Sequence, residues 1–237
     1  NRFDMIKRRI DFVESIEEIG SEIWNNLAGT DNPFTRYEFL YSLESTGCTT
    51  EITGWKPYHV LVTESDSEGE TCGRPIAVMP LYLKSNSWGE YVFDWSWAEA
   101  YARHGINYYP KFVTSIPFTP SAGNRIMMKG GIDRVEIAQL IYEGIQLKAE
   151  TLGASSWHVL FPKDEDHELL CSIGTQPRVA TQFHWFNNGY ANFSDFLASL
   201  NARKRKAIKK ERKNIKDEGI MFRQTDGTDI SEEQWSD

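Results

Sequence analysis

The side chains best suited to acid–base chemistry lie close together in the middle of the chain. Glu90 and Asp94 stand beside tryptophans, which can exclude water from a carboxylate and so raise its pKa toward neutrality. The alternative is that these two carboxylates cap a surface turn or form salt bridges there. The same stretch also contains the imidazole of His104 and the phenols of Tyr108 and Tyr109, and the phenols can protonate a leaving group. The candidates for acid–base catalysis are therefore Glu90, Asp94, His104, Tyr108 and Tyr109.

The histidines give two further candidates and no metal motif. His158 alternates with apolar residues on an expected strand, and His184 lies in a similar setting. Each is interpreted either as a core histidine or as a residue that lines a cleft between two units. His59 and His167 are expected at the surface. No spacing resembles a metal-ligand pattern such as HExxH, so we predict no metal site.

The many aromatic residues in the middle of the chain are interpreted either as core residues or as the wall of a substrate cleft. Half of them are expected to pack in the core, and the others are expected to clamp an extended acyl, peptide or sugar substrate. The dense set is Trp88, Tyr91, Phe93, Trp95, Trp97, Tyr101, Tyr108 and Tyr109. The residues expected in the substrate cleft are Trp95, Trp97, Lys111, His158 and His184.

Positive charge is concentrated in one segment, Arg203–Lys216, which holds nine basic residues and one acidic residue. The rest of the chain has 17 basic and 33 acidic residues, a net charge of −16. A solvated helix face, an RNA-binding module and an anion-docking element are the alternatives. Because the acidic remainder would repel RNA, we favour anion docking by Arg203, Lys204 and Arg205, or an intramolecular clasp with acidic residues. Acidic residues at 64–70 and 164–168 are expected in solvated turns.

Composition limits the class of protein. The chain has 237 residues, 40% of them apolar, and a net charge of −8, which excludes wholesale disorder and argues against a general nucleic-acid protein. No apolar run approaches the roughly 18 residues of a membrane span, and the first residues carry no signal-peptide pattern. Three cysteines without CxxC spacing indicate a reducing cytoplasm.

Capping and hydrophobic periodicity predict an α/β first domain, residues 1–177. Ser15 with Glu18, and Thr35 with Glu38, each predict a helix by a capping box. A strand, a crossover helix and a strand predict one parallel pairing added to an antiparallel meander in a mixed sheet. The expected strands are 5–10, 58–63, 75–84, 111–118 and 155–161; the expected helices are 15–29, 35–47, a short one within 88–110, and 132–152.

A second unit is expected from residue 178 to residue 237. The pattern predicts a strand at 182–186, one long helix from Phe193 to Glu218 that Gly219 ends, a strand at 220–225, and a helix that begins at Ser231. These elements cannot close a core alone. The sequence therefore suggests a fragment of a longer protein with an incomplete second domain.

Three long motifs carry a family resemblance: GEYVFDWSWAEAY (89–101), YYPKFVTSIPFTPSAGNR (108–125) and SSWHVLFP (155–162). With the basic run ARKRKAIKKERKNIKDEG, they resemble the FemAB-like N-acyltransferases, relatives of the peptidoglycan aminoacyl-transfer ligases. The resemblance implies two tandem domains of the GNAT (Gcn5-related acetyltransferase) fold. It implies transfer of an acyl or aminoacyl group to an amine. The usual GNAT signature Q/R-x-x-G-x-G/A is absent, so a CoA-type and a tRNA-type donor both stay open.

Acyl transfer of this kind needs a site for the donor's phosphates. Backbone N–H groups of a glycine-containing loop before a helix would supply it. The loop candidates are Phe118, Gly123, Asn124 and Arg125, the last as a charge-assisted phosphate contact. Gly130-Gly131 is a second possibility, but Asp133 would oppose a phosphate there. The alternative is an ordinary turn.

These observations predict an N-acyltransferase that uses direct attack by the amine, because no cysteine has a neighbouring base in the sequence. Acyl-CoA or aminoacyl-tRNA is the expected co-substrate, a cell-wall precursor or another small molecule is the expected acceptor, and no permanently bound cofactor is expected. The main alternative is a non-catalytic protein that recognises cell-wall or lipid-linked ligands through the aromatic cleft. A nucleic-acid-binding module is a third reading.

Overall fold

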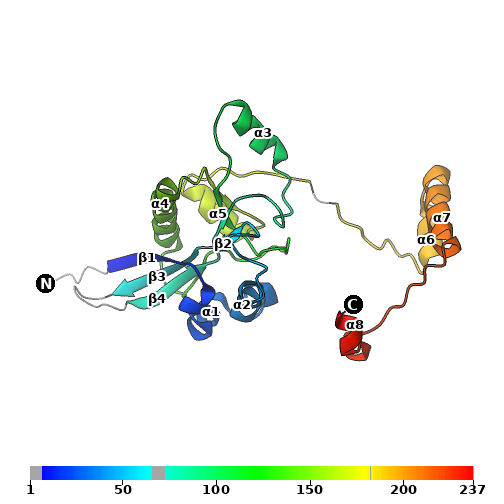
Figure 1. The fold of residues 1–237 in the computed structure, drawn as a ribbon, viewed down its shortest axis with the longest axis horizontal. Helices are drawn as coiled ribbons and strands as arrows, with labels where there is room; N and C mark the ends of the chain where they lie inside the picture. Colours follow the sequence, from blue (N-terminus) through cyan, green and yellow to red (C-terminus); the bar gives the residue numbers. More distant parts are fainter. Residues whose placement is uncertain (1–6, 66–72, 182, 237) are drawn as a thin grey trace. The chain divides into compact units, whose positions relative to one another are not determined.

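The computed structural model describes residues 7–65, 73–181 and 183–236. The chain divides into two compact units, Asn1–Arg178 and Val179–Asp237. We describe each unit separately and use the element labels of Figure 1.

The first sheet of the first unit is antiparallel throughout. Its strands are β1 (Lys7–Val13), β3 (His59–Ser65), β4 (Arg74–Met79) and β7 (Met127–Met128), in the order β1-β3-β4-β7. The expected hairpin is confirmed as β3 and β4. The expected first strand is found from Lys7 onward and continues to Val13, because its whole length pairs with β3. Its first two expected residues lie outside the described residues.

The second sheet is mixed and carries the crossover. Its strands are β2 (Trp55–Pro57), β5 (Tyr82–Lys84), β6 (Lys111–Thr114) and β8 (Trp157–Val159), in the order β2-β5-β6-β8. Strands β6 and β8 are parallel, and helix α4 (Arg134–Leu152) lies between them in the sequence. The mixed α/β class, with an antiparallel meander and one parallel crossover, is thereby confirmed.

One expected strand is divided between the two sheets. The run 75–84 forms β4 up to Met79 and β5 from Tyr82. Pro80, between them, has no N–H to donate to a ladder, so regular pairing stops there. A backbone hydrogen bond from Tyr58 N to Leu81 O (2.8 Å) links the chain at the place where the sheets separate.

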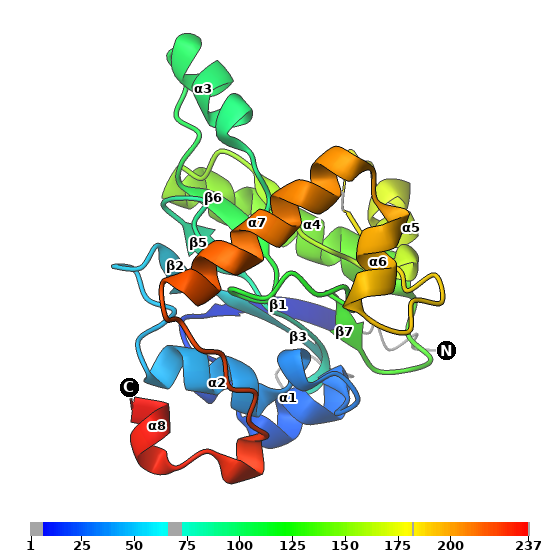
Figure 2. The same cartoon turned by 90° about the vertical axis from the view of Figure 1, so that its right-hand side faces the viewer.

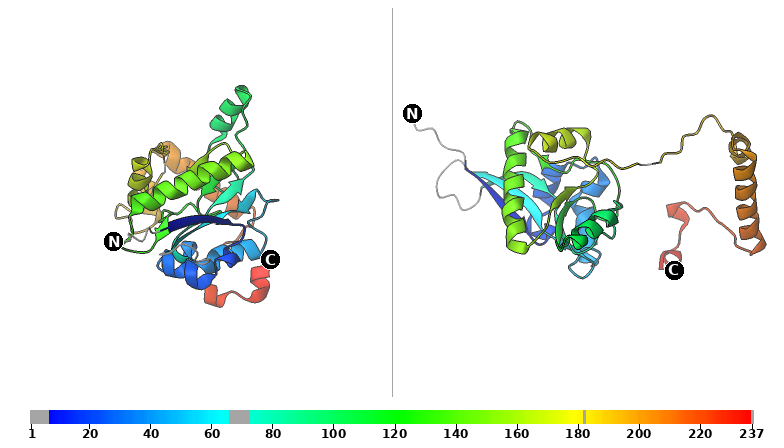
Figure 3. Two further views of the ribbon diagram at one scale, coloured as in Figure 1. Left: turned by 90° about the vertical axis from the view of Figure 1, so that its left-hand side faces the viewer. Right: turned by 90° about the horizontal axis from the view of Figure 1, so that it is seen from above.

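Helices cover both faces of the first sheet. Helices α1 (Ser21–Ala28) and α2 (Tyr37–Ser45) lie on one face, and α4 and α5 (Asp164–Ser172) lie on the other (Figures 1 and 3). Neighbouring residues of β4 point to opposite faces, so Val78 packs with Trp24 and Leu40, whereas Ala77 packs with Ile141. Each face therefore has its own hydrophobic core.

The first two helices begin differently from the expectation. The capping box of Ser15 and Glu18 is present, but it caps only a three-residue 3-10 turn. Gly20 (φ 83°) interrupts the chain before α1 starts, so the single helix 15–29 is wrong. The capping box of Thr35 is also wrong, because its hydroxyl donates to Asn32 O (3.1 Å) and α2 begins after Arg36.

Helices α3 (Trp95–Arg103) and α5 complete the first unit. The short helix expected within 88–110 is confirmed as α3, which buries none of its residues and stands away from the sheets (Figure 2). The turn expected at 164–168 is wrong, since these residues begin α5. Asp166 is fully buried there, because its carboxylate accepts hydrogen bonds from the backbone of Arg125 and Ile126.

The second unit is helical in its described part. Helices α6 (Phe193–Ser199) and α7 (Ala202–Asp217) replace the single long helix, whereas the helix expected from Ser231 is confirmed as α8 (Glu232–Ser236). The long helix is wrong because the side chain of Asn201 accepts a hydrogen bond from Lys204 N (2.9 Å) and starts a new helix. Among the described residues of 183–186 and 220–225, no strand forms, and Gln182 lies outside the described residues. No helix within the described part is long and apolar enough to cross a membrane.

Candidate active site

A buried ammonium group is the centre of the candidate site. Lys111, the first residue of β6, is fully buried, and its Nζ donates to Ser87 Oγ (3.0 Å), Glu90 Oε2 (2.8 Å) and Asp94 Oδ2 (2.5 Å). The two carboxylates come from the segment just before α3, which therefore folds back over the start of β6. Burial of an ion pair carries a desolvation cost that good hydrogen-bond geometry must offset.

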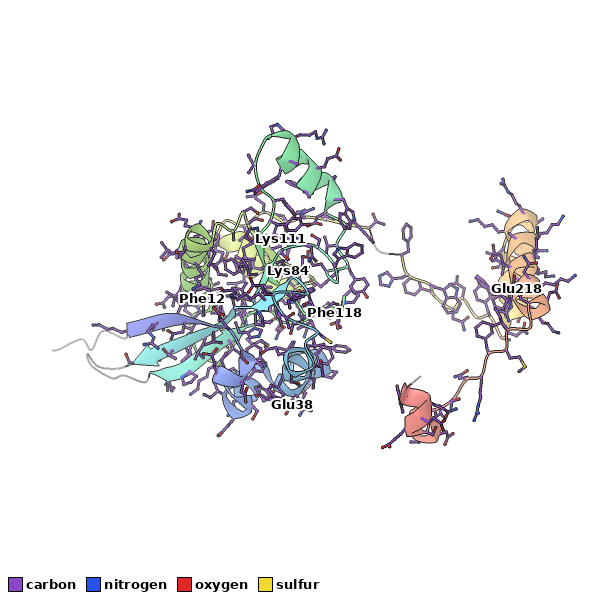
Figure 4. The ribbon with its side chains drawn as sticks, in the orientation of Figure 1. Phe12, Glu38, Lys84, Lys111, Phe118 and Glu218 are labelled. Carbon is purple, nitrogen blue, oxygen red and sulfur yellow. The ribbon has the colours of Figure 1, made fainter. Side chains whose placement is uncertain are left out.

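A second buried lysine lies directly opposite the first. Lys84 of β5 pairs in register with Lys111 of β6, and Figure 4 shows the two side chains near each other inside the first unit. Lys84 Nζ donates to Trp88 O (3.1 Å) and lies 3.6 Å from the ring centroid of Trp55. The pKa of Lys84 is lowered to about 7, mainly by burial; Lys111 adds to the shift, and Glu90 and Asp94 oppose it.

The two carboxylates have different electrostatic settings. Burial raises the pKa of Glu90 above its usual value, although Lys111 opposes the shift. Burial acts in the same direction on Asp94, but hydrogen bonds from Lys111 and Tyr108 outweigh it and lower its pKa. The predicted rise in pKa therefore agrees with the structure for Glu90 and is wrong for Asp94. Among the described residues, Glu90 Oε1 and Asp94 Oδ1 have no hydrogen-bond partner.

The two tyrosines take part in the hydrogen-bond network. Tyr108 donates its phenol proton to Asp94 Oδ2 (2.7 Å), and burial together with Asp94 raises the pKa of Tyr108. A raised phenol pKa makes Tyr108 a weaker acid, so its expected role as proton donor does not fit this geometry. The hydroxyl of Tyr109 shares a hydrogen bond with Ser87 Oγ (2.7 Å).

The histidines take separate positions. His158 of β8 lies 6.0 Å from Tyr108 between ring centroids, with Nε2 2.9 Å from Ser156 Oγ. Burial, then the charges of Lys111 and Arg178, lowers the pKa of His158 to about 4, so it is neutral at pH 7. His104 is exposed at the end of α3, where Nδ1 contacts Ala100 O (2.8 Å). His184 is exposed in the second unit and stacks on Phe186.

Helix α3 presents an aromatic surface next to the network. Trp95 and Trp97 are 54% and 48% exposed. Trp95 meets the edge of Trp88 at 5.8 Å, and Arg178 lies 4.6 Å from the ring of Trp97. Helix α3 and the segment that follows it form a hollow of about 490 Å³, whose lining residues are Ala98, Ala102, Gly105, Ile106, Asn107, Tyr108 and Tyr109. Tyr108 and Tyr109 of the network thus also form part of the wall of a space large enough for a ligand.

The expected phosphate loop is used for internal contacts. Arg125 is fully buried; its Nε donates to Leu160 O (2.9 Å) and one terminal nitrogen donates to Ser121 O (2.6 Å). The N–H of Gly123 bonds to Phe161 O (3.2 Å). The phosphate contact expected for Arg125 therefore does not fit the structure, because its donors face backbone carbonyls. Asn124 is exposed, and Phe118 (φ 58°) packs against Trp55 at 5.5 Å.

The alternative loop before α4 is closed by its own cap. Asp133 accepts hydrogen bonds from Val135 N (2.9 Å) and Glu136 N (3.3 Å). Its carboxylate therefore occupies the helix N-terminus, which agrees with the expectation that Asp133 would oppose a phosphate at Gly130-Gly131.

The residues expected to dock an anion lie at the start of α7. Arg203 and Lys204 are exposed. Arg205 instead donates to Leu197 O (2.9 Å) and Leu200 O (2.8 Å), so it fixes the corner between α6 and α7. Two of the three cations are therefore available to a ligand.

Sequence reasoning missed Lys84 and His59. The position of Lys84 in an apolar strand, ahead of two carboxylates, is the signal that could have identified it. His59, expected at the surface, is fully buried, and Nε2 lies 2.8 Å from Glu44 Oε1. Within residues 7–65, 73–181 and 183–236, no group of three or more metal-ligating side chains is placed to hold an ion.

Comparison with known protein families identifies the family of this chain. The FemAB-like family model, described as peptidoglycan biosynthesis/recognition, matches residues 15–237, which confirms the resemblance seen in the sequence. No curated protein matches the chain.

Several solved structures are similar in fold. An aminoglycoside 6'-N-acetyltransferase from Acinetobacter baumannii has 13% identity and a TM-score of 0.45, covering 77% of this chain and 100% of that one. An aminoglycoside 6'-N-acetyltransferase from Acinetobacter haemolyticus has 12% identity and a TM-score of 0.43, covering 75% and 97%. A GCN5-related N-acetyltransferase from Ralstonia eutropha has 11% identity and a TM-score of 0.40, covering 76% and 98%. Similarities at this level carry no information on what this chain binds.

Proposed function

Because this chain belongs to the FemAB-like family of peptidoglycan biosynthesis/recognition, we propose that it transfers an acyl or aminoacyl group to an amine. The observation that carries the proposal is the buried network of Lys84, Glu90, Asp94 and Lys111. Buried groups with shifted pKa values beside a hollow are typical of catalytic sites.

In the proposed reaction, the acceptor amine must be neutral before its nitrogen attacks the acyl carbonyl. Glu90 is the proposed base, because its raised pKa brings it closer to the pH at which proton transfer is efficient and because Oε1 is unpartnered among the described residues. The new bond joins the amine nitrogen to the acyl carbon, and the thioester or ester bond of the donor breaks. The proton lost by the amine passes to Glu90, and Glu90 then gives it to the thiolate or alkoxide that leaves, so the carboxylate is regenerated.

The other members of the network position Glu90. Lys111 holds Glu90 and Asp94 as its two ionic partners, and Asp94 in turn holds Tyr108. Lys84, with a pKa of about 7, is the nearby group whose positive charge lowers the pKa of Glu90. Acyl-CoA and aminoacyl-tRNA are the proposed donors, and a cell-wall precursor is the proposed acceptor. Both donors are cytoplasmic, so we place the reaction there.

A binding protein without catalysis is the second candidate. The exposed rings of Trp95 and Trp97 favour it, because sugars and peptides commonly stack on aromatic side chains that protrude into solvent. In that case, the buried charges would serve only to hold α3 against β6.

Label transfer tests the proposal. The full chain is incubated with radiolabelled acyl-CoA or aminoacyl-tRNA and with amines that include a lysine-containing cell-wall peptide. We expect labelled amide from one donor class, and we expect Glu90→Gln to lower kcat about 100-fold. Glu99→Gln, an exposed carboxylate of α3, is the matched control and should keep full activity. No amide with any donor, together with a raised melting temperature in cell-wall glycan, would instead establish the binding protein.

A further inference from the structure

An arginine without an acidic partner lies against helix α3. Arg178, the last residue of the first unit, is exposed, and its guanidinium carbon lies 4.6 Å from the ring centroid of Trp97. Across residues 7–65, 73–181 and 183–236, Arg178 takes part in no ion pair. A cation over an aromatic ring is held in place by electrostatic attraction to that ring. Arg178 is thus a positioned charge that no described carboxylate neutralises.

The phenol of Tyr108 also holds this guanidinium. Tyr108 donates its proton to Asp94, so the phenol oxygen is left as the acceptor for a hydrogen bond from Arg178. This hydrogen bond opposes burial and Asp94, which together raise the pKa of Tyr108. A guanidinium carries more N–H donors than one phenol oxygen can accept. Arg178 therefore keeps N–H donors for a further partner.

The carboxylates around α3 do not take these donors. Glu90 and Asp94 pair with Lys111, and each of the two side chains is only 1% exposed. Glu99 follows Trp97 by two positions, and two residues of an α-helix turn through about 200°, so Glu99 lies on the opposite side of α3. The remaining N–H donors of Arg178 are therefore open to solvent, and so to a ligand.

A hollow large enough for a small molecule lies beside this arginine. Tyr108, which Arg178 contacts, forms part of the wall of the hollow of about 490 Å³. The apolar side chains of Ala98, Ala102 and Ile106 form another part of that wall. A ligand with an apolar body and one anionic group matches these surroundings.

Carboxylate and phosphate are the two anions that arginine commonly binds, and the rest of the first unit favours carboxylate. Phosphate sites usually add backbone N–H groups of a glycine loop at a helix N-terminus. Here the donors of Arg125 face backbone carbonyls, and Asp133 occupies the N-terminus of α4. The planar guanidinium matches the two oxygens of a carboxylate with two parallel N–H···O bonds. A carboxylate therefore needs no donor beyond this fork.

We propose that Arg178 binds the carboxylate of a small molecule or short peptide whose body occupies the hollow beside α3. The proposal rests on the proposed function in one respect: the ligand is then the acyl acceptor, which carries both an amine and a carboxylate. Binding of the carboxylate can be measured without any acyl donor, so the two proposals are tested separately.

Isothermal titration calorimetry on the full chain compares an acid with its uncharged match. The probes are Nα-acetyl-dialanine in its L,L and D,D forms, the corresponding C-terminal amides, and inorganic phosphate. We expect one acid to bind at least tenfold more tightly than its amide, because only the acid accepts charge-assisted hydrogen bonds. Three results overturn the proposal: equal affinity of acid and amide, no heat from either acid at millimolar concentration, or tighter binding of phosphate than of the acids.

Variants locate the site. Arg178→Gln should abolish the difference between acid and amide, and Arg178→Lys, which keeps the charge and loses the planar fork, should reduce it about threefold. Arg103→Gln, a change at an exposed arginine of α3 outside the hollow, should leave the difference intact. Full discrimination in Arg178→Gln would place the carboxylate elsewhere. Binding of the acid without any labelled amide in the transfer assay would keep the carboxylate site and remove acyl transfer.

Discussion

Two lysines face each other across the ladder of β5 and β6, and their partners are unequal. Lys111 has Glu90 and Asp94, whereas Lys84 has, among the described residues, only the carbonyl of Trp88 and the ring of Trp55. Like charges directly opposite on neighbouring strands are destabilising, and burial increases the effect. Burial, together with the positive charge of Lys111 opposite, therefore lowers the pKa of Lys84 to about 7.

This difference predicts how stability depends on pH. An unfolded lysine keeps its proton up to a pH of about 10.4, whereas folded Lys84 loses it near 7, so the unfolded state binds more protons between these values. The free energy of unfolding should therefore rise with pH from 7 to 9, and the stabilisation should be lost as the pH falls through 7. In Lys84→Met the rise should be much smaller.

Urea unfolding at pH 7, 8 and 9 measures this dependence. Lys129→Met, a change at an exposed lysine, serves as the control and should keep the slope of the unchanged chain. An identical slope in Lys84→Met would show that Lys84 keeps its charge in the folded protein.

At the scale of elements, one acidic residue joins α5 to the loop before β7. Asp166 accepts hydrogen bonds from Arg125 N (2.5 Å) and Ile126 N (3.3 Å), and it pairs with Arg134 (2.6 Å) at the start of α4. The loop before β7, helix α4 and helix α5 thus meet at one buried carboxylate. Because Asp166 holds the backbone N–H of Arg125, the Arg125 side chain is positioned to donate its Nε hydrogen bond to Leu160 O.

Asp166→Ala should destabilise the first unit by about 2–4 kcal/mol, because it leaves buried N–H groups without an acceptor and removes the partner of Arg134. Asp164→Ala is the control, since that carboxylate is exposed in the same turn of α5. Chemical denaturation of both variants gives the comparison. Equal losses in the two variants would mean that Asp166 contributes only as a residue near the helix N-terminus.

At the scale of the whole molecule, apolar burial is concentrated in the first unit. Both hydrophobic clusters lie between Ile10 and Ile173. In the described part of the second unit, Leu197 is the one buried apolar residue, and α7 buries none of its residues. Hydrophobic burial is the main favourable contribution to folding, so the first unit holds most of the stability.

Limited digestion with chymotrypsin tests this division. The first cuts should fall at the exposed aromatic residues Phe183, Trp185 and Phe186, which lie outside helices and strands. The N-terminal product should melt within about 3 °C of the full chain, because it keeps both clusters. Earlier cleavage within α3 or the sheets, identified by mass spectrometry, would contradict the division.

Local signals in the sequence determined the class of fold and several of its elements. The β3–β4 hairpin, the crossover through α4 and the end of α7 at Gly219 follow from periodicity, turn residues and a glycine that tolerates positive φ. The family also follows from the sequence, because its motifs are long. Carboxylates Glu90 and Asp94 were identified as candidates from their aromatic neighbours alone.

Only the tertiary structure decided which charges are buried and what they contact. Arg125 and Asp166 have the sequence appearance of loop residues, and His59 that of a surface residue, yet all three are buried because distant strands and helices supply their partners. The pairing of Lys84 with Lys111 depends on strand register over 27 residues of chain. A pKa depends on such neighbours and on burial, and neither is encoded in the local pattern that defines a helix or a strand.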